Sequence, residues 1–199
     1  SSTSRGLGDV YKRQNKDSAF GLKAIGKVGQ NRDNQGLSEY SIAASSTAIY
    51  QGDPIMMAAT GKIVVGTAAA VLLGSLNGVF FTDATTSKPT YANHLNGSNT
   101  ASDIVGFVSD DPYERFEIQS DAALAVAEIG LNADIVYAAG STPNFVSKVE
   151  LDHSDLKTAT AQLRVIGISK DPENNEAGAA DTNAVVIINE HFLKGTVGI

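Results

Sequence analysis

The sequence predicts an all-β protein, a β-barrel or β-sandwich of about ten to twelve short strands with at most one or two short helical turns. Short apolar runs recur along the chain, and Gly, Asn or Asp-Pro interrupts them every few residues. Residues 49–81 show this rhythm most clearly, and it is typical of strands joined by tight turns. A later run at 185–188 is apolar throughout, as in a strand covered on both faces.

About a dozen segments carry the patterns expected of strands. They lie at 20–28, 39–44, 47–57, 62–65, 71–73, 78–82, 104–109, 113–119, 135–137, 145–151, 162–169 and 184–190. In the segment 113–119, alternation places Phe116 and Ile118 toward a core. The same alternation directs Arg115, Glu117 and Gln119 toward water.

Two local signals refine this reading. Pro54, in Gly52-Asp53-Pro54, lacks a backbone donor, so we expect it to start a strand or to bend one. The segment 122–129 has helical spacing between a possible cap at Asp121 and a possible stop at Gly130. It is short, so we expect a single helical turn there.

The chain is expected to hold one β-rich domain at 15–199. Residues 1–14 carry three basic residues and one acidic residue, a net +2, which takes the remaining residues from the −7 of the whole chain to −9. They resemble an adapter-derived scar found in translations of environmental sequence, so we expect a foreign, disordered segment. Residues 15–36 are a possible N-terminal arm, and the polar stretch 83–102 is read as a long surface loop.

Composition argues against several classes of partner. A net charge of −7 disfavours non-specific binding to nucleic acid. Residues 63–81 lack charge over the length of a membrane span, but closely spaced turn residues divide them into strand-sized pieces, so no membrane partner is expected. The chain has no Cys, so disulfides play no part in the prediction.

Two clusters supply residue types used in active sites or metal sites. His153, Ser154 and Asp155 could form a hydrolase triad, but adjacent residues seldom point at one another, and we read them as a polar turn. Asp171, Glu173, Asn175 and Glu176 suggest a calcium loop. The sixth and twelfth positions of that loop hold Glu176 and Thr182, so the EF-hand pattern fails, and a looser calcium site remains open.

The other candidates favour structural roles. Asp110 and Asp111 are best explained by an Asp-Pro turn, with Asp53 far away in sequence. His94 and His191 lack companions at metal-ligand spacing and are read as surface or packing residues. Asn96-Gly97-Ser98 fits a glycosylation acceptor, although a turn is the better reading. We therefore predict no catalytic, cofactor-binding or metal-binding residues, no cofactor, and no enzymatic activity.

Several segments, in order, resemble a family of small structural proteins of tailed phages that is common in marine metagenomes and similar to capsid decoration (cement) proteins. The likeness covers nearly all of residues 15–199, and its most recognisable piece is Ile49-Tyr50-Gln51-Gly52-Asp53-Pro54. The other pieces are Phe20-Gly21-Leu22, Tyr40-Ser41-Ile42-Ala43, Leu73-Gly74 through Phe80-Phe81, Asp110-Asp111-Pro112 through Gln119, and Asn189-Glu190-His191.

The resemblance implies a virion structural protein that binds the outside of an icosahedral capsid and stabilises it. The implied partner is the major capsid protein, the implied oligomer is a homotrimer, and the implied location is the capsid exterior, with the host cytoplasm during assembly. The segments 83–102 and 15–36 are the candidate contact regions. Binding through area and many modest contacts needs no reaction centre, which agrees with the residue-level reading.

Other functions remain open from the sequence. The chain could be another virion component, such as a head fibre or a tail protein; the shell subunit itself is disfavoured because little helix is predicted. A carbohydrate-binding β module would need exposed aromatic side chains, for which Tyr91 and Tyr113 are the candidates. A hydrolase built around His153 is the least favoured alternative.

Overall fold

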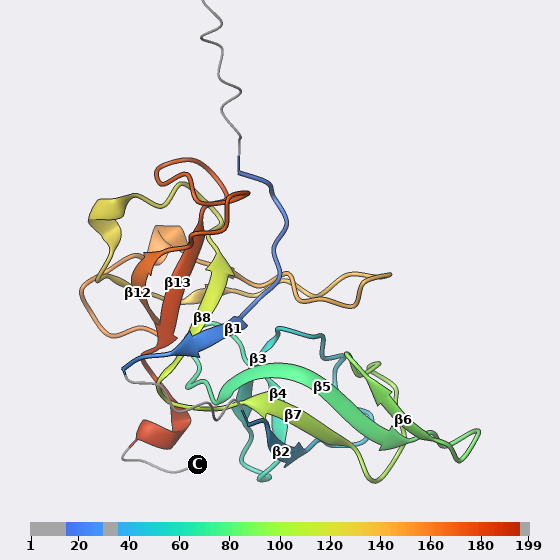
Figure 1. Ribbon diagram of the computed structural model, residues 1–199. Helices are drawn as coiled ribbons and strands as arrows, with labels where there is room; N and C mark the ends of the chain where they lie inside the picture. Colours follow the sequence, from blue (N-terminus) through green and yellow to red (C-terminus); the bar gives the residue numbers. More distant parts are fainter. Residues whose placement is uncertain (1–14, 30–35, 196–199) are drawn as a thin grey trace, which may run out of the picture.

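A computed structural model describes residues 15–29 and 36–195 (Figure 1). The protein is nearly all β, with 39% of residues in strands and 5% in short helical turns, which confirms the predicted fold class. Its sheets are antiparallel, as in a β-sandwich, and the described part forms no closed barrel. The adapter-like segment 1–14, with its predicted disorder, and residues 30–35 of the predicted arm lie outside the described residues.

The first sheet has five strands in the order β1-β8-β13-β12-β9, all antiparallel. Their bounds are β1 Lys23–Lys27, β8 Glu114–Gln119, β13 Asn183–Ile188, β12 Leu163–Ile168 and β9 Asn132–Ala133. A small pair, β10 (Ile135–Val136) with β11 (Glu150–Leu151), reaches this sheet through a bridge between Ser120 and Leu151.

The second sheet is built from the chain between β1 and β8, so it is an insertion into the first. Its order is β2-β7-β5-β3-β4, and β6 also pairs with β5. The bounds are β2 Ser38–Ser41, β3 Pro54–Met57, β4 Ile63–Val65, β5 Gly74–Thr82, β6 Pro89–Ala92 and β7 Val105–Ser109. Figure 1 shows the two sheets in separate halves of the molecule, with the β5–β6 hairpin projecting from the second.

Each sheet has its own hydrophobic core. Phe116, Ile118 and Val186 belong to the first core, and Ile55, Leu76 and Val108 belong to the second. Leu72 packs in the first core and its neighbour Leu73 in the second, because successive side chains of an extended chain point to opposite sides. The segment 71–73 therefore holds the two halves together.

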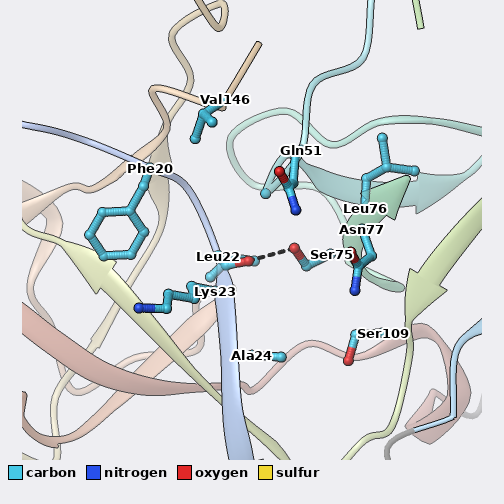
Figure 2. A pocket seen from close by; sticks show the side chains of 11 residues that line it. Phe20, Leu22, Lys23, Ala24, Gln51, Ser75, Leu76, Asn77, Ser109 and Val146 are labelled. Atoms are coloured by element: carbon cyan, nitrogen blue, oxygen red, sulfur yellow. Dashed lines mark hydrogen bonds between the residues drawn. The ribbon is translucent and has the colours of Figure 1, made fainter. Parts of the chain in front are cut away.

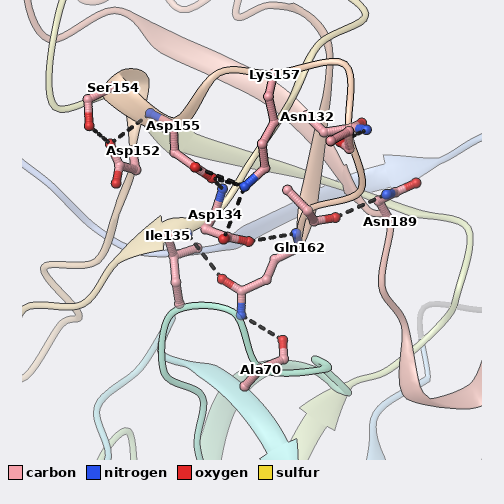
Figure 3. Close-up of polar contacts among 12 residues, drawn as sticks. Ala70, Asn132, Asp134, Ile135, Asp152, Ser154, Asp155, Lys157, Gln162 and Asn189 are labelled. Atoms are coloured by element: carbon pink, nitrogen blue, oxygen red, sulfur yellow. Dashed lines mark hydrogen bonds and ion pairs between the residues drawn. The ribbon is translucent and has the colours of Figure 1, made fainter.

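A buried glutamine also connects the two halves (Figure 3). Gln162, which precedes β12, donates from Nε2 to the carbonyl oxygens of Thr67 (2.8 Å) and Ala70 (2.6 Å) in the second half. Its Oε1 accepts from the backbone N–H of Ile135 at 3.1 Å. Because the Gln162 side chain is fully buried, these bonds satisfy polar groups that would otherwise destabilise the fold.

Several predicted elements are shorter than expected. The predicted helical segment 122–129 contains one 3-10 turn, η1 (Val126–Glu128); the described residues hold two more, η2 (His153–Asp155) and η3 (Phe192–Lys194), one beyond the expected number. Of the predicted strand 145–151 only β11 is regular. The predicted strand 71–73 supplies a single bridge, from Leu72 to His191. Pro54 starts β3, as predicted.

The prediction that Glu117 and Gln119 face water is wrong, although Arg115 is exposed as expected. Both side chains are buried because the N-terminal segment and the residues after β12 cover this face of β8. Glu117 accepts hydrogen bonds from Ser169 and Asn183. Gln119 accepts from the N–H of Ser18 and donates to the carbonyl of Lys16. The alternation of polar and apolar residues along β8 does not show that other segments cover its polar face.

The N-terminal segment 15–22 is fastened to both halves. Asn15 donates to the carbonyls of Glu176 and Ala180 beside the first sheet. Gly21 lies so close to the second half that a Cβ there would sit 2.2 Å from the carbonyl oxygen of Gly52, and its φ is +73°. Only glycine satisfies both conditions, and the approach lets Leu22 donate its N–H to Gly52 at 2.8 Å.

The reading of 83–102 as a surface loop outside the core is also wrong. Residues 89–92 form β6, which pairs with β5, and Leu95 and Ala101 are buried in the second core. The longest exposed run includes the tip at 84–88, where Asp83 accepts hydrogen bonds from the N–H groups of Thr85 and Thr86. The segment 83–102 is mostly polar, so its sequence did not indicate that Leu95 packs in the second core.

Candidate binding surfaces

The hydrolase-like residues are not arranged as a triad. They form the turn η2, as the polar-turn reading predicts, and each has a different partner. His153 Nε2 lies 3.1 Å from Glu128 Oε1, whereas Ser154 Oγ donates to Asp152. Asp155 pairs with Lys157 at 2.7 Å, and this hydrogen bond lowers the Asp155 pKa (Figure 3). Ser154 and His153 therefore do not contact each other, so the serine–histidine pair that a hydrolase triad needs is not formed.

The calcium-loop residues lie in a turn that follows β12. Asp171 accepts from the N–H of Glu173, and the Glu176 carbonyl accepts from Asn15 and Thr182. Within residues 15–29 and 36–195, no group of three or more His, Asp or Glu side chains is placed to hold a metal ion. Asn96-Gly97-Ser98 forms the predicted turn, closed by the Asn99 N–H on the Asn96 carbonyl at 3.2 Å.

Asp110 and Asp111 have separate partners and do not act as a carboxylate pair. Asp110 accepts from Ser38 Oγ at 2.9 Å and from the Tyr40 hydroxyl at 2.6 Å. Burial and this bond raise the Tyr40 pKa to about 12. Asp111 pairs with Lys27 at 2.5 Å, which lowers the pKa of the Asp111 carboxyl. These contacts fix the turn after β7.

Asp53 and His191 are buried, which their sequence context did not indicate. Asp53 Oδ2 accepts the Tyr50 N–H at 2.8 Å, and burial raises the Asp53 pKa to about 6. His191 Nδ1 accepts the Leu193 N–H at 3.1 Å, and burial followed by the charge of Lys194 lowers the His191 pKa to about 4. His94 is half-buried and stacks on Phe145, with ring centroids 3.8 Å apart. Each therefore has a packing role.

A concave site lies where β1 crosses one end of the second sheet (Figure 2). It is a cavity of about 300 Å³, with Leu22 and Ala24 on one wall and Leu76, Asn77 and Ser109 on the other. Ser75 Oγ donates to the Leu22 carbonyl at 2.5 Å and closes its floor. Within the described chain, the side chains of Gln51, Asn77 and Ser109 make no hydrogen bond, so they can serve a ligand.

An aromatic surface continues from this cavity along the outer face of the second sheet. Register places Phe80 opposite both Tyr91 and Val105, and Phe107 two residues before Ser109, so these side chains share one face. The Tyr91 ring lies 4.8 Å from Phe80 and 6.3 Å from Phe107, and Tyr91 is 75% exposed. We call Phe80, Tyr91 and Phe107 the aromatic shelf.

A second surface gathers exposed apolar side chains beside the Lys27–Asp111 ion pair. We call Val28, Leu37, Tyr113 and Leu193 the apolar patch; they are four of the ten large apolar side chains that the described surface exposes. Val28 donates its N–H to the Tyr113 carbonyl at 2.8 Å. Leu37 and Leu193 line one shallow hollow beside Lys27. Lys194 Nζ sits 4.4 Å from the centre of the Tyr113 ring.

Sequence reasoning identified Tyr91 and Tyr113 as exposed aromatics but did not group either with its neighbours. The alternation Pro89-Thr90-Tyr91-Ala92 was the available signal for β6, and it lay inside the presumed loop. The apolar patch combines residues more than 150 positions apart, from Val28 to Leu193, and no local pattern joins them.

Comparison with protein-family models, with curated proteins and with solved structures gives no match. The described chain also has no helix with the length and hydrophobicity needed to cross a membrane.

Proposed function

We propose that this chain is a structural protein of a tailed-phage virion that binds the outer surface of the capsid and stabilises it. The ordered resemblance over residues 15–199 supports the class of partner, the major capsid protein. The all-β architecture supports a binding role that depends on the shape and area of a firm surface.

The observation that carries the proposal is the apolar patch. Interfaces between proteins combine apolar and aromatic side chains at their centre with charged groups at their rim. Val28, Leu37 and Leu193 are 48%, 42% and 52% exposed, and the Lys27–Asp111 pair adjoins them. Burying these side chains against a capsid subunit would remove apolar area from water, which favours association.

A homotrimer at a symmetry axis of the shell is part of the proposal. Three linked copies would engage three neighbouring capsid subunits at once, so weak individual contacts would give stable attachment. This arrangement bridges subunits and resists outward pressure from packaged DNA.

Co-sedimentation with undecorated capsids of the same phage tests this function. The wild-type protein is expected to bind with a saturable stoichiometry, and changing both Tyr113 and Leu193 to Asp should weaken binding by about ten-fold or more. Tyr91→Asp, at a still more exposed tyrosine outside the apolar patch, is the matched control and should bind capsids as the wild type does. Absence of saturable binding by the wild-type protein would contradict the proposal; attachment only to heads with fibres or to tails would favour another virion component.

A further inference from the structure

We infer that the aromatic shelf and the adjoining cavity form a binding site for a neutral, hexose-based glycan. The site lies on the outer face of the second sheet and shares no residue with the apolar patch. The inference is independent of the proposed attachment to a capsid.

The shelf provides the apolar half of such a site. The rings of Tyr91 and Phe107 are within 18° of parallel, with centroids 6.3 Å apart, although β5 runs between their strands. Gly78 lies opposite Phe107 and leaves room for this approach. A pyranose ring presents a face of C–H groups, and the negative face of an aromatic ring attracts such groups. Tyr91, 75% exposed, offers its ring to this contact.

The cavity provides the polar half. Asn77 sits in the β5 bulge between Leu76 and Gly78, and its side chain is exposed. Ser109 follows Phe107 by two residues on the same face of β7. Together with Gln51, these side chains offer hydrogen-bonding groups that no described residue uses. Ligand sites combine an apolar or aromatic surface with a few such groups, and a sugar needs both.

The charged side chains on this face favour a neutral ligand. The register places Glu39, Ser41, Thr82 and Pro89 on the same outer face as the shelf, and none of these positions is basic. Lys23 lines the cavity, but its Nζ lies 3.6 Å from Glu117, and Figure 2 shows it directed away from Asn77 and Ser109. Among the residues that the structure describes on this face, an acidic polysaccharide would meet no unpaired cation, and Glu39 would repel it.

A protein partner fits this site less well. A stable protein interface buries about 800 Å² on each side, whereas the shelf offers three rings beside a cavity of about 300 Å³. The size and the mixture of one stacking surface with three free polar side chains match one or two sugar rings.

Affinity electrophoresis in gels containing soluble polysaccharides tests the inference with the whole chain. The probes are mixed-linkage β-glucan, galactomannan, dextran and hydroxyethylcellulose, with alginate as the acidic comparison. We expect at least one neutral polysaccharide to retard the wild-type protein and alginate to leave it unretarded. Tyr91→Ala should weaken this retardation by about ten-fold because the stacking surface is lost.

Two further variants separate recognition from folding. Tyr91→Phe keeps the ring and should retain glycan binding. Tyr113→Ala, at an exposed tyrosine of the apolar patch, should bind glycan as the wild type does. Unfolding curves that match those of the wild type would show that Tyr91→Ala remains folded. The inference is overturned if no neutral polysaccharide retards the protein, or if Tyr91→Ala is retarded as strongly as the wild type. It is also overturned if Tyr91→Ala no longer binds capsids but still binds glycan as the wild type does.

Discussion

Asp53 and His191 are buried side chains whose ionisation should affect stability in opposite directions. Asp53 lies between Gly52 and Pro54 at the junction of the two halves, and one of its carboxylate oxygens has no partner among the described residues. His191 precedes η3 and bridges to Leu72, and its Nε2 is also unpartnered within the described chain. Burial disfavours the charged form of each group.

Changing Asp53 to Asn should stabilise the protein at neutral pH. The folded-state Asp53 pKa is about 6, above the ordinary 3.8, so the protonated form contributes stability that is complete below about pH 4 and lost as pH rises through 6. Asn avoids the buried charge, and we expect a gain of roughly 1–3 kcal/mol at pH 7.5 that disappears near pH 4. Urea denaturation at both pH values measures this difference.

Glu39→Gln, at an exposed carboxylate on β2, is the control for Asp53→Asn and should change the free energy of unfolding by no more than about 0.5 kcal/mol. An Asp53→Asn protein no more stable than wild type at pH 7.5 would show that the Asp53 carboxylate is well solvated or paired.

Changing His191 to Gln should stabilise the protein toward acid pH. The folded-state His191 pKa is about 4, below the ordinary 6.5, so the stability that neutral His191 contributes is present above pH 6.5 and lost as pH falls through 4. Gln keeps an acceptor for the Leu193 N–H and does not titrate. The gain relative to wild type should grow to roughly 3 kcal/mol by pH 4.

The two groups therefore offset one another in the wild type between pH 4 and 6.5. The free energy of unfolding of His191→Gln should rise as pH falls through this window, and that of Asp53→Asn should fall. Parallel pH profiles for the two variants, from urea melts across the window, would contradict these assignments.

Among the secondary-structure elements, the β5–β6 hairpin has an exposed tip, whereas the segment that follows the hairpin is partly buried. The exposed tip at 84–88 projects from the second sheet, whereas residues 89–101 return to it and bury Leu95 and Ala101 (Figure 1). Deleting 83–102 would therefore remove part of the core together with any surface contact. Replacing only 84–87 with Asn-Gly, a favoured hairpin turn, tests a role of the tip in capsid binding without this loss.

Leu95→Ala should destabilise the protein by about 2–5 kcal/mol, because Leu95 is fully buried in the second core and its truncation leaves a cavity. Ser98→Ala, three residues away at an exposed position, should change stability by less than about 0.5 kcal/mol. Chemical denaturation of the two variants in parallel measures both effects. Similar midpoints would mean that 93–101 is not anchored in the core.

The sequence predicted most elements where short-range patterns decide the structure. Apolar runs located β3, β4, β7, β12 and β13, and Pro54 marked the start of β3. Prediction from the sequence failed where distant parts of the chain decide which side chains are buried: Glu117 and Gln119 are covered by residues near Ser169 and Lys16. The same limit hid the aromatic shelf, because pairing of β6 with β5 brings Tyr91 to Phe80 and Phe107.

At the scale of the whole molecule, one sheet is inserted between two strands of the other, and the two cores meet at Leu72, Leu73 and Gln162. Neither surface that we assign to binding lies at that junction of cores: the apolar patch adjoins the Lys27–Asp111 pair, and the aromatic shelf lies along β5, β6 and β7. A change in one surface should leave the other in place.

The proposed trimer predicts a solution mass of three times the 20.7 kDa chain. Light scattering after size exclusion measures it directly. A monomer mass at all accessible concentrations would remove the trimer from the proposal while leaving attachment of single copies to be tested on shells.

Cryo-electron microscopy of capsids saturated with the purified protein tests the central claim most directly. We predict additional density at regular positions on the outside of the shell, with Tyr113 and Leu193 against the capsid subunits and the projecting β5–β6 hairpin identifying the orientation. Shells that carry no ordered external density after incubation, with the protein shown to be folded in the same sample, would contradict it.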